Sequence, residues 1–193
     1  SRYCYLDERE SAKLKETLKG ENPLPPAELL QTALSESYLG EPVHLTDEVR
    51  EAITQLAKEP ELAVPRGLKG KLRPYQKRGY EWMYRNSQLG FGSIIADDMG
   101  LGKTIQVIAL LLKLKHDAKK KKGGSARFLV IVPTTLITNW QAELDRFVPS
   151  MKYTVYHGSG RDIEKFKEDM LLTTYGVVRS DADIMQEKEW NTV

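Results

Sequence analysis

A glycine-rich turn between a short apolar segment and a long helical pattern constrains this chain most strongly. The segment Ser93–Ala96 is apolar, the turn Asp97–Gly102 carries two glycines, and a helix is expected from about Lys103 to His116. Glycine adopts left-handed backbone angles without a Cβ clash, so successive N–H groups of such a turn can point to one centre. The N-terminus of the following helix adds its positive dipole there. The pattern predicts a strand, a phosphate-binding loop and a helix.

Two side chains at the end of the turn fit nucleotide chemistry. The Lys103 ammonium would reach the β- and γ-phosphates, and the Thr104 hydroxyl would ligate magnesium, so both are candidate catalytic residues. The simpler alternative is a glycine turn whose lysine and threonine only cap a helix. Residues expected around the phosphates are Asp98, Met99, Gly100, Leu101, Gly102, Lys103, Thr104 and Ile105.

Two departures narrow the kind of nucleotide site. Asp97 stands where the common phosphate loop has glycine, and no Asn-Lys-x-Asp sequence follows to read guanine. The loop is therefore not that of a common small-molecule kinase or GTPase. The Asp98 carboxylate would repel phosphate, so we expect a neighbouring backbone N–H or the magnesium shell to hold it.

The second half of the chain alternates between helices and strands. We expect a helix from Pro74 with Tyr75, Gly79, Trp82 and Met83 on one face. Beyond the turn, helices are expected at 136–147 and 161–168, and strands at 128–132, 153–156 and 170–174. Such alternation predicts an α/β fold with a doubly wound parallel sheet, which binds ligands at the carboxyl ends of its strands.

Residues 1–65 have a different character. Apolar stripes predict one helix through Leu29 and Leu34 and another after Thr46, with no chemistry-bearing motif. We interpret 1–65 as a small helical accessory segment or the tail of an upstream domain. The boundary is marked by Pro60 and by the Pro65-Arg66-Gly67 sequence.

Charge is distributed unevenly. Residues 1–64 hold 7 basic and 13 acidic side chains, 65–128 hold 15 and 4, and 129–193 hold 7 and 10. A basic middle region indicates an anionic partner. The Lys119–Lys122 run by itself fits a solvated loop equally well.

Other composition features exclude several classes of protein. The longest apolar stretches, Val107–Leu112 and Phe128–Val132, are too short to span a bilayer, and no apolar signal core follows the N-terminus. A single cysteine and three histidines allow no internal disulfide and disfavour a structural metal site. We expect a reducing compartment, the bacterial cytoplasm or nucleoid, and no membrane partner.

Several motifs in order resemble the Swi/Snf family of ATPases, of bacterial type, within helicase superfamily two. The first two are Leu72-Arg73-Pro74-Tyr75-Gln76 with Gly79 and Trp82, and the run from Ala96 to Gln106. The others are Val130–Pro133 with Asn139, Trp140 and Glu143, then Tyr156-His157-Gly158, then Leu172–Tyr175. The resemblance covers residues 66–193, which would be the N-terminal part of a first RecA-like lobe.

The resemblance implies roles for further residues. Gln76, with Arg73, would bind the adenine of ATP. Thr134, Thr135 and Asn139 of motif Ia, and Thr173 and Thr174 of motif Ib, would contact the phosphate backbone of double-stranded DNA. Thr135 could instead simply cap a helix.

The resemblance also implies parts that this sequence does not contain. No Asp-Glu box follows the phosphate loop, and the second RecA-like lobe with its arginine finger is missing. We interpret the chain as part of a DNA-dependent ATPase that translocates on duplex DNA, using ATP and magnesium and acting on a DNA-bound protein complex. Alone it should bind nucleotide weakly and hydrolyse little. Two alternatives stay open: a strand-separating helicase, and a non-catalytic nucleotide-binding module that docks partners.

Overall fold

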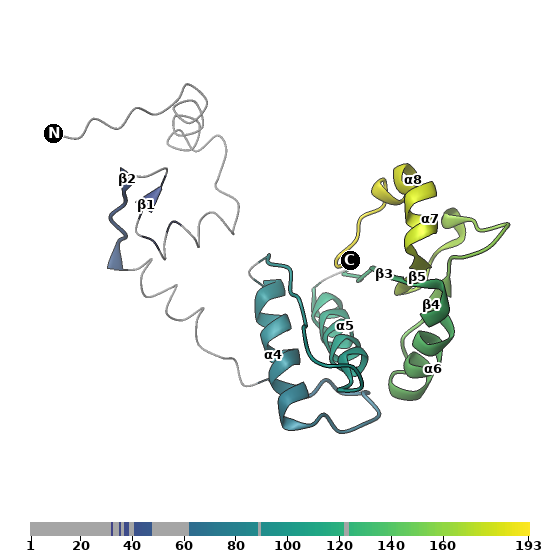
Figure 1. Cartoon of the computed structure of the whole chain (residues 1–193), viewed down its shortest axis with the longest axis horizontal. Helices are drawn as coiled ribbons and strands as arrows, with labels where there is room; N and C mark the ends of the chain where they lie inside the picture. The colour runs from purple at the N-terminus through teal and green to yellow at the C-terminus, as the bar shows by residue number, and fades with distance from the viewer. Residues whose placement is uncertain are drawn as a thin grey trace. The chain divides into compact units, whose positions relative to one another are not determined.

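The computed structural model describes residues 62–193, apart from 89, 122 and 123, together with 32, 35, 37, 38 and 41–47. The helices expected through Leu29–Leu34 and after Thr46 lie almost wholly outside these residues. A short antiparallel pair, β1 (Ser37–Tyr38) and β2 (Glu41–Pro42), is an element that the sequence did not predict (Figure 1). The chain divides into two compact units, residues 1–60 with 85–93 and residues 61–84 with 94–193. All the candidate site residues belong to the second.

The second unit has the expected α/β architecture. Its sheet has the order β3-β5-β4, and both pairings are parallel. The strands are β3 (Phe128–Val132), β4 (Tyr153–Val155) and β5 (Met170–Thr174). Helix α4 (Pro74–Gln88) belongs to this unit as far as Tyr84. The other helices are α5 (Lys103–Lys120), α6 (Ile137–Phe147), α7 (Tyr175–Ser180) and α8 (Ala182–Gln186), with 3-10 turns η1 (Thr134–Leu136) and η2 (Ile163–Lys165). Strands 128–132 and 170–174 have the predicted bounds.

Alternating strand residues divide the core between the two faces of the sheet. Phe128 and Met170 pack with the apolar faces of α5 and α6, including Ile108, Leu112 and Leu144. Their neighbours Leu129 and Leu171 point the other way and pack with η2, α7 and α8 through Ile163, Phe166, Val177 and Met185. The period of two along each strand thus places helices on both faces.

The strand expected at 93–96 does not form. Ile94 is 87% exposed, and the segment pairs with no strand among the described residues. One edge of β3 is taken by β5. At its other edge the Leu129 N–H donates to the Thr192 carbonyl at 3.0 Å, so that edge is also occupied where β3 begins. An extended apolar segment becomes a strand only when a partner supplies its hydrogen bonds.

The prediction of a helix at 161–168 is also wrong, because only η2 forms there. The Asp162 carboxylate accepts from the Glu164 N–H at 3.0 Å and starts a single tight turn. Ile163 and Phe166, three residues apart, are both buried, as the 3-10 repeat allows. The buried face of α4 differs too, since it consists of Gln76, Tyr80 and Met83, while Trp82 is 39% exposed.

Helix α4 packs closely on the start of α5 at Gly79. A Cβ on Gly79 would lie 2.0 Å from Gln106 Oε1, so a larger residue there would require the Gln106 side chain to move. The Gln106 side chain is almost fully buried, and its Nε2 donates to Asp97 Oδ2 at 3.3 Å. Gln106 therefore links α4 to the first residue of the glycine-rich turn.

A buried ion pair ties α5 to the amino end of the sheet. Lys115 Nζ donates to Asp169 Oδ2 at 2.6 Å and to the Ser150 carbonyl at 3.1 Å. The Lys115 side chain is 8% exposed. The same Asp169 oxygen accepts from the Lys152 N–H at 2.9 Å. Both charges are thus compensated at the point where β4 and β5 begin.

Replacing Lys115 with methionine should lower the free energy of unfolding by about 2 kcal/mol, because it leaves a partly buried carboxylate without its cation. Lys120→Met is the matched control on the same helix, since Lys120 is 77% exposed and its pair with Asp117 should contribute less than about 0.5 kcal/mol. Urea unfolding followed by circular dichroism measures both. Equal small losses would show that the Lys115 pair does not stabilise the fold.

Gly79→Ala should destabilise the chain by about 1–3 kcal/mol, because the new methyl group displaces a packed Gln106, although alanine is the better helix former. Gly92→Ala, where a Cβ meets nothing within 4 Å, is the control. Thermal unfolding of the two variants checks this. A Gly79→Ala protein as stable as the control would contradict the packing described here.

Candidate functional site

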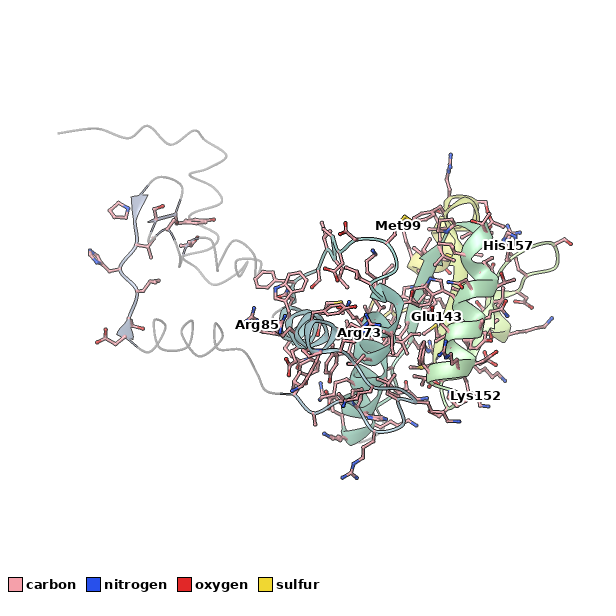
Figure 2. The ribbon with its side chains drawn as sticks, turned by 60° about the horizontal axis from the view of Figure 1, so that its bottom comes forward. Arg73, Arg85, Met99, Glu143, Lys152 and His157 are labelled. Carbon is pink, nitrogen blue, oxygen red and sulfur yellow. The ribbon has the colours of Figure 1, made fainter. Side chains whose placement is uncertain are left out.

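The turn between Ala96 and Lys103 forms an open loop at the start of α5. Gly100 and Gly102 have φ values of +84° and +74°, the left-handed region that glycine tolerates. Gly102 is the N-cap residue, and no side chain caps the first turn of α5. The side chain of Met99, a residue of this loop, is 97% exposed (Figure 2). The first-turn N–H groups of α5 are thus available to an anion.

The Lys103 ammonium lies inside this loop. It donates to the carbonyls of Asp97 at 2.6 Å and Asp98 at 2.8 Å. These neutral acceptors hold the cation next to the helix N-terminus without neutralising its charge. An entering phosphate would find both the ammonium and the N–H groups on the same side of the chain.

Helix α4 holds the loop through one carbonyl. Gln76 Nε2 and the Tyr75 hydroxyl both donate to the Leu101 carbonyl at 3.0 Å. Gln76 Oε1 accepts from the Arg73 N–H at 2.9 Å, and a Cβ on Gly102 would lie 2.5 Å from Gln76 Nε2. The Gln76 side chain is buried, and these bonds use one of its two amide N–H groups and one of its oxygen lone pairs. Gln76 and Gly102 were predicted as separate candidate residues, and the structure brings them into contact.

Three other loop residues are placed differently from expectation. Ile105 is buried in the core between α4 and α5, so only its backbone can face a ligand. The Asp98 carboxylate makes no hydrogen bond with another described residue, so no backbone N–H holds it here. Its alternative place in the magnesium shell stays a prediction. The held carboxylate is that of Asp97, and its partner Gln106 was missed. The available signal was a polar residue inside the apolar run of α5.

A second group of candidates lies where the parallel strands end. Thr134, Thr135 and Asn139 are exposed in η1 and the first turn of α6, directly after β3. Val132 pairs with Thr174, so this turn and the start of α7 lie at neighbouring strand ends. His157 and Gly158 follow β4 at the same edge, and Figure 2 shows His157 at the opposite end of the sheet from Lys152.

Thr173 and Thr174 lie at this edge but face inward. The Thr173 hydroxyl donates to the Tyr156 carbonyl at 2.8 Å, and Thr174 Oγ1 accepts from the Val177 N–H at 3.4 Å. Both side chains are buried. Their hydroxyls therefore tie β5 to β4 and cap α7, and neither is available to a DNA phosphate in this structure.

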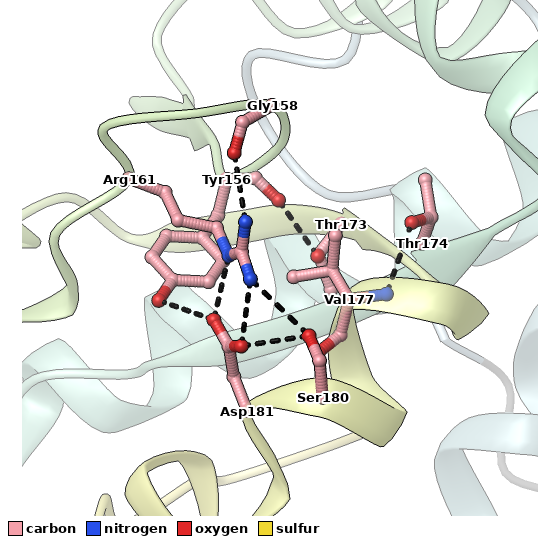
Figure 3. Close-up of polar contacts among 8 residues, drawn as sticks. All are labelled: Tyr156, Gly158, Arg161, Thr173, Thr174, Val177, Ser180 and Asp181. Atoms are coloured by element: carbon pink, nitrogen blue, oxygen red, sulfur yellow. Dashed lines mark hydrogen bonds and ion pairs between the residues drawn. The ribbon is translucent and has the colours of Figure 1, made fainter.

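A polar network that sequence analysis missed surrounds Asp181 (Figure 3). Arg161 Nε and Nη2 donate to its two oxygens at 2.6 and 2.8 Å, and the Tyr156 hydroxyl donates at 2.8 Å. Arg161 Nη1 also donates to the Gly158 carbonyl at 2.8 Å. The hydrogen bonds from Arg161 hold the pKa of the Asp181 carboxyl well below its usual range. Twenty residues separate the partners, so no local pattern indicated the pair.

The described part of the chain lacks two kinds of feature. It contains no cluster of three or more histidine, cysteine or acidic side chains that could hold a metal ion. Nor does it contain a helix with the length and apolarity needed to cross a membrane.

Comparisons with known proteins agree with the motifs. The SNF2-related domain family matches residues 75–193. YwqA of Bacillus subtilis, a candidate ATP-dependent helicase/translocase, is 37% identical over 166 residues, covering 81% of this chain and 18% of YwqA. Helicase SWR1 of Cryptococcus neoformans is 38% identical over 139 residues, covering 68% of this chain and 11% of that protein. The chain thus spans less than a fifth of these relatives.

Two solved structures show the same fold. The SWI2/SNF2 ATPase core domain of Sulfolobus solfataricus matches with a TM-score of 0.59 and 40% identity, covering 70% of this chain and 27% of the core. The same core in complex with double-stranded DNA matches with a TM-score of 0.57 and 41% identity, covering 68% and 27%. The sheet order, the loop before α5 and these matches together assign the chain to the SNF2-related family of helicase superfamily two, as part of its first RecA-like lobe.

Proposed function

We propose that this chain is the ATP-binding part of a DNA-dependent ATPase that translocates on double-stranded DNA and remodels protein–DNA complexes. The observation that carries the proposal is the loop before α5, where an uncapped helix N-terminus and the Lys103 ammonium lie together. The name of the DNA-bound Sulfolobus core supports the choice of duplex DNA as partner. A cytoplasmic or nucleoid location belongs to the same proposal.

The residues of the loop have distinct tasks in nucleotide binding. Lys103 exchanges its two neutral carbonyl partners for phosphate oxygens, which is a gain because the new acceptors carry the opposite charge. Gln76 offers its remaining N–H and lone pair to the adenine edge while it holds Leu101. Base binding and loop geometry are therefore coupled through one side chain.

Thr104 fits a role as magnesium ligand. Its side chain is half-buried in the first turn of α5, and its hydroxyl makes no hydrogen bond with another described residue. Magnesium bound with the nucleotide would neutralise charge on the phosphates. The donor is a neutral oxygen, which suits this cation.

Hydrolysis needs groups that the chain does not supply. No Asp-Glu pair follows Lys103, and a transition-state arginine contributes roughly 1,000–100,000-fold to the rate in related chemistry. We therefore place the attacking-water site and the arginine outside residues 1–193. By itself the chain binds nucleotide and hydrolyses it negligibly.

The exposed residues after the strand ends are suited to contact the phosphates of a DNA strand. Thr134, Thr135 and Asn139 present hydroxyl and amide groups at the carboxyl edge of the sheet. Contacts of this kind position a protein on DNA without reading its sequence. A protein that moves along DNA needs contacts that are the same at every step.

Lys103→Ala should weaken binding of an ATP analogue to this chain about 10–100-fold, because one charge-assisted contact to phosphate is lost. Lys152→Ala is the control, since Lys152 is exposed at the opposite end of the sheet. Fluorescence titration with a labelled ATP analogue measures both. An unchanged affinity for Lys103→Ala would show that the loop does not hold the phosphates.

The full-length protein that contains this chain should hydrolyse ATP faster when duplex DNA is added, without separating the strands. In that protein, Thr135→Ala with Asn139→Ala should raise the DNA concentration for half-maximal stimulation about tenfold, because each lost contact weakens phosphate binding. The salt dependence should stay unchanged, since the removed groups are neutral. Steady-state ATPase titrations measure these effects.

Ser150→Ala, at the amino end of the sheet, is the control for these titrations. A wild-type enzyme that no nucleic acid stimulates would overturn the DNA-dependent ATPase. Strand displacement in a parallel assay would assign the protein to the unwinding enzymes instead.

A further inference from the structure

The network around Asp181 joins two segments at the carboxyl edge of the sheet. Arg161 belongs to the loop between β4 and η2, and Asp181 lies between α7 and α8. The guanidinium binds both carboxylate oxygens, the arrangement that fixes geometry as well as adding energy. Ser180 adds a hydroxyl that donates to Asp181 Oδ1 at 2.7 Å. We call Arg161, Asp181, Tyr156 and Ser180 the Asp181 clamp (Figure 3).

The clamp leaves Arg161 little capacity to bind a ligand itself. Four of its five N–H groups are directed at Asp181, Ser180 and the Gly158 carbonyl. Its pKa is raised by the hydrogen bonds to Asp181, so the guanidinium stays charged and paired. The Asp181 side chain is only 12% exposed. Arg161 is therefore placed to hold neighbouring parts of the protein and not to bind a ligand.

The groups that it holds are those of the loop His157–Gly160. Gly158 and Gly160 have φ values of +83° and +78°, and a Cβ at either would meet nothing within 4 Å, so the loop faces open space. Within the part of the chain that is described, the backbone N–H groups of 157–160 have no hydrogen-bond acceptor. Successive free N–H groups in a turn of this kind bind anionic oxygens.

The loop is also tied to the neighbouring strand end. The Tyr156 carbonyl, directly before His157, accepts from the Thr173 hydroxyl at 2.8 Å. Arg161 then fixes the far side of the loop through Gly158. The loop is thus tied to α7, which follows the middle strand β5 and lies between the loop and the segment Thr134–Thr135 at the same edge of the sheet.

We propose that Arg161 and Asp181 are positioning residues of the DNA interface, and that they hold the backbone of His157–Gly160 as a further contact to the phosphates of duplex DNA. This inference rests on the proposed function. The alternative is that Arg161 binds a phosphate directly. The two hypotheses differ in the role of Asp181, because a positioning pair needs its acidic residue as much as its basic one.

The decisive test compares Asp181→Asn with Arg161→Gln in the full-length protein, using ATPase stimulation by a duplex of about 30 base pairs. Both variants should raise the half-stimulating DNA concentration on the order of tenfold, because both release the loop. The KM for ATP without DNA should change less than about twofold, since neither Arg161 nor Asp181 forms a hydrogen bond with the loop before α5. Arg161→Lys, which keeps one bond to Asp181, should recover part of the loss.

A direct phosphate contact predicts the opposite for the acidic partner. Asp181→Asn would then bind DNA as well as or better than the wild type, because a negative charge near the phosphates is gone. Arg161→Gln would also lower the slope of log affinity against log salt by about 1. Either result overturns the proposal.

Tyr156→Phe guards against loss of folding, because it removes a single hydroxyl from the clamp. It should weaken DNA stimulation about two- to threefold while the thermal midpoint falls by only a few degrees, so the variant stays folded. If the wild type is stimulated by DNA and all these variants match it, the clamp has no positioning role. If the wild type itself is not stimulated, the proposed function fails first.

Discussion

Parallel pairing of β3 with β5 is the constraint on which the candidate interface depends. Its register places Val132 opposite Thr174, so the two segments after these strands begin side by side. The same direction in β4 brings His157 to that edge. A parallel sheet can be joined only through crossovers, and the helices of those crossovers leave one edge for strand ends and ligands. Residues as far apart in sequence as Thr134 and Gly160 thereby lie at one edge of the sheet.

The nucleotide loop depends on a different kind of contact, a shared carbonyl. Leu101 accepts from both Tyr75 and Gln76, and Gln106 holds Asp97 at the other end of the turn. The left-handed φ of Gly102 favours glycine, and at both Gly79 and Gly102 a glutamine side chain fills the space that a Cβ would take. The geometry of the turn is thus set by α4 as much as by its own residues. If binding of the proposed adenine base moved α4, the movement would be transmitted to the proposed phosphate-binding loop directly and not through the sheet.

The sequence predicted the features that local pattern determines. Strand 128–132 is a continuous apolar run and strand 170–174 begins with three apolar residues, and such runs in a helix–strand alternation identify buried parallel strands. The segment 93–96 has the same local character, but strand formation needs a partner, and that is a non-local property. Thr173 and Thr174 were assigned to DNA from a motif, yet motif position does not reveal on which side of the strand a hydroxyl lies. The Arg161–Asp181 pair could not be predicted from the sequence either, because only the fold brings its two members together.

The charge of the proposed interface suits movement along DNA. Neither 133–139 nor 157–160 contains a lysine or arginine, and Arg161 is neutralised by Asp181. The basic excess lies instead in 65–128, around the nucleotide loop and along α4 and α5. Neutral hydroxyl, amide and backbone N–H groups release no counterions when they bind phosphate, so each contact is weak and nearly independent of salt. In the proposed translocase, a lobe that releases and rebinds DNA in every cycle would need contacts of that strength. The loop held by the Asp181 clamp would supply them without adding charge.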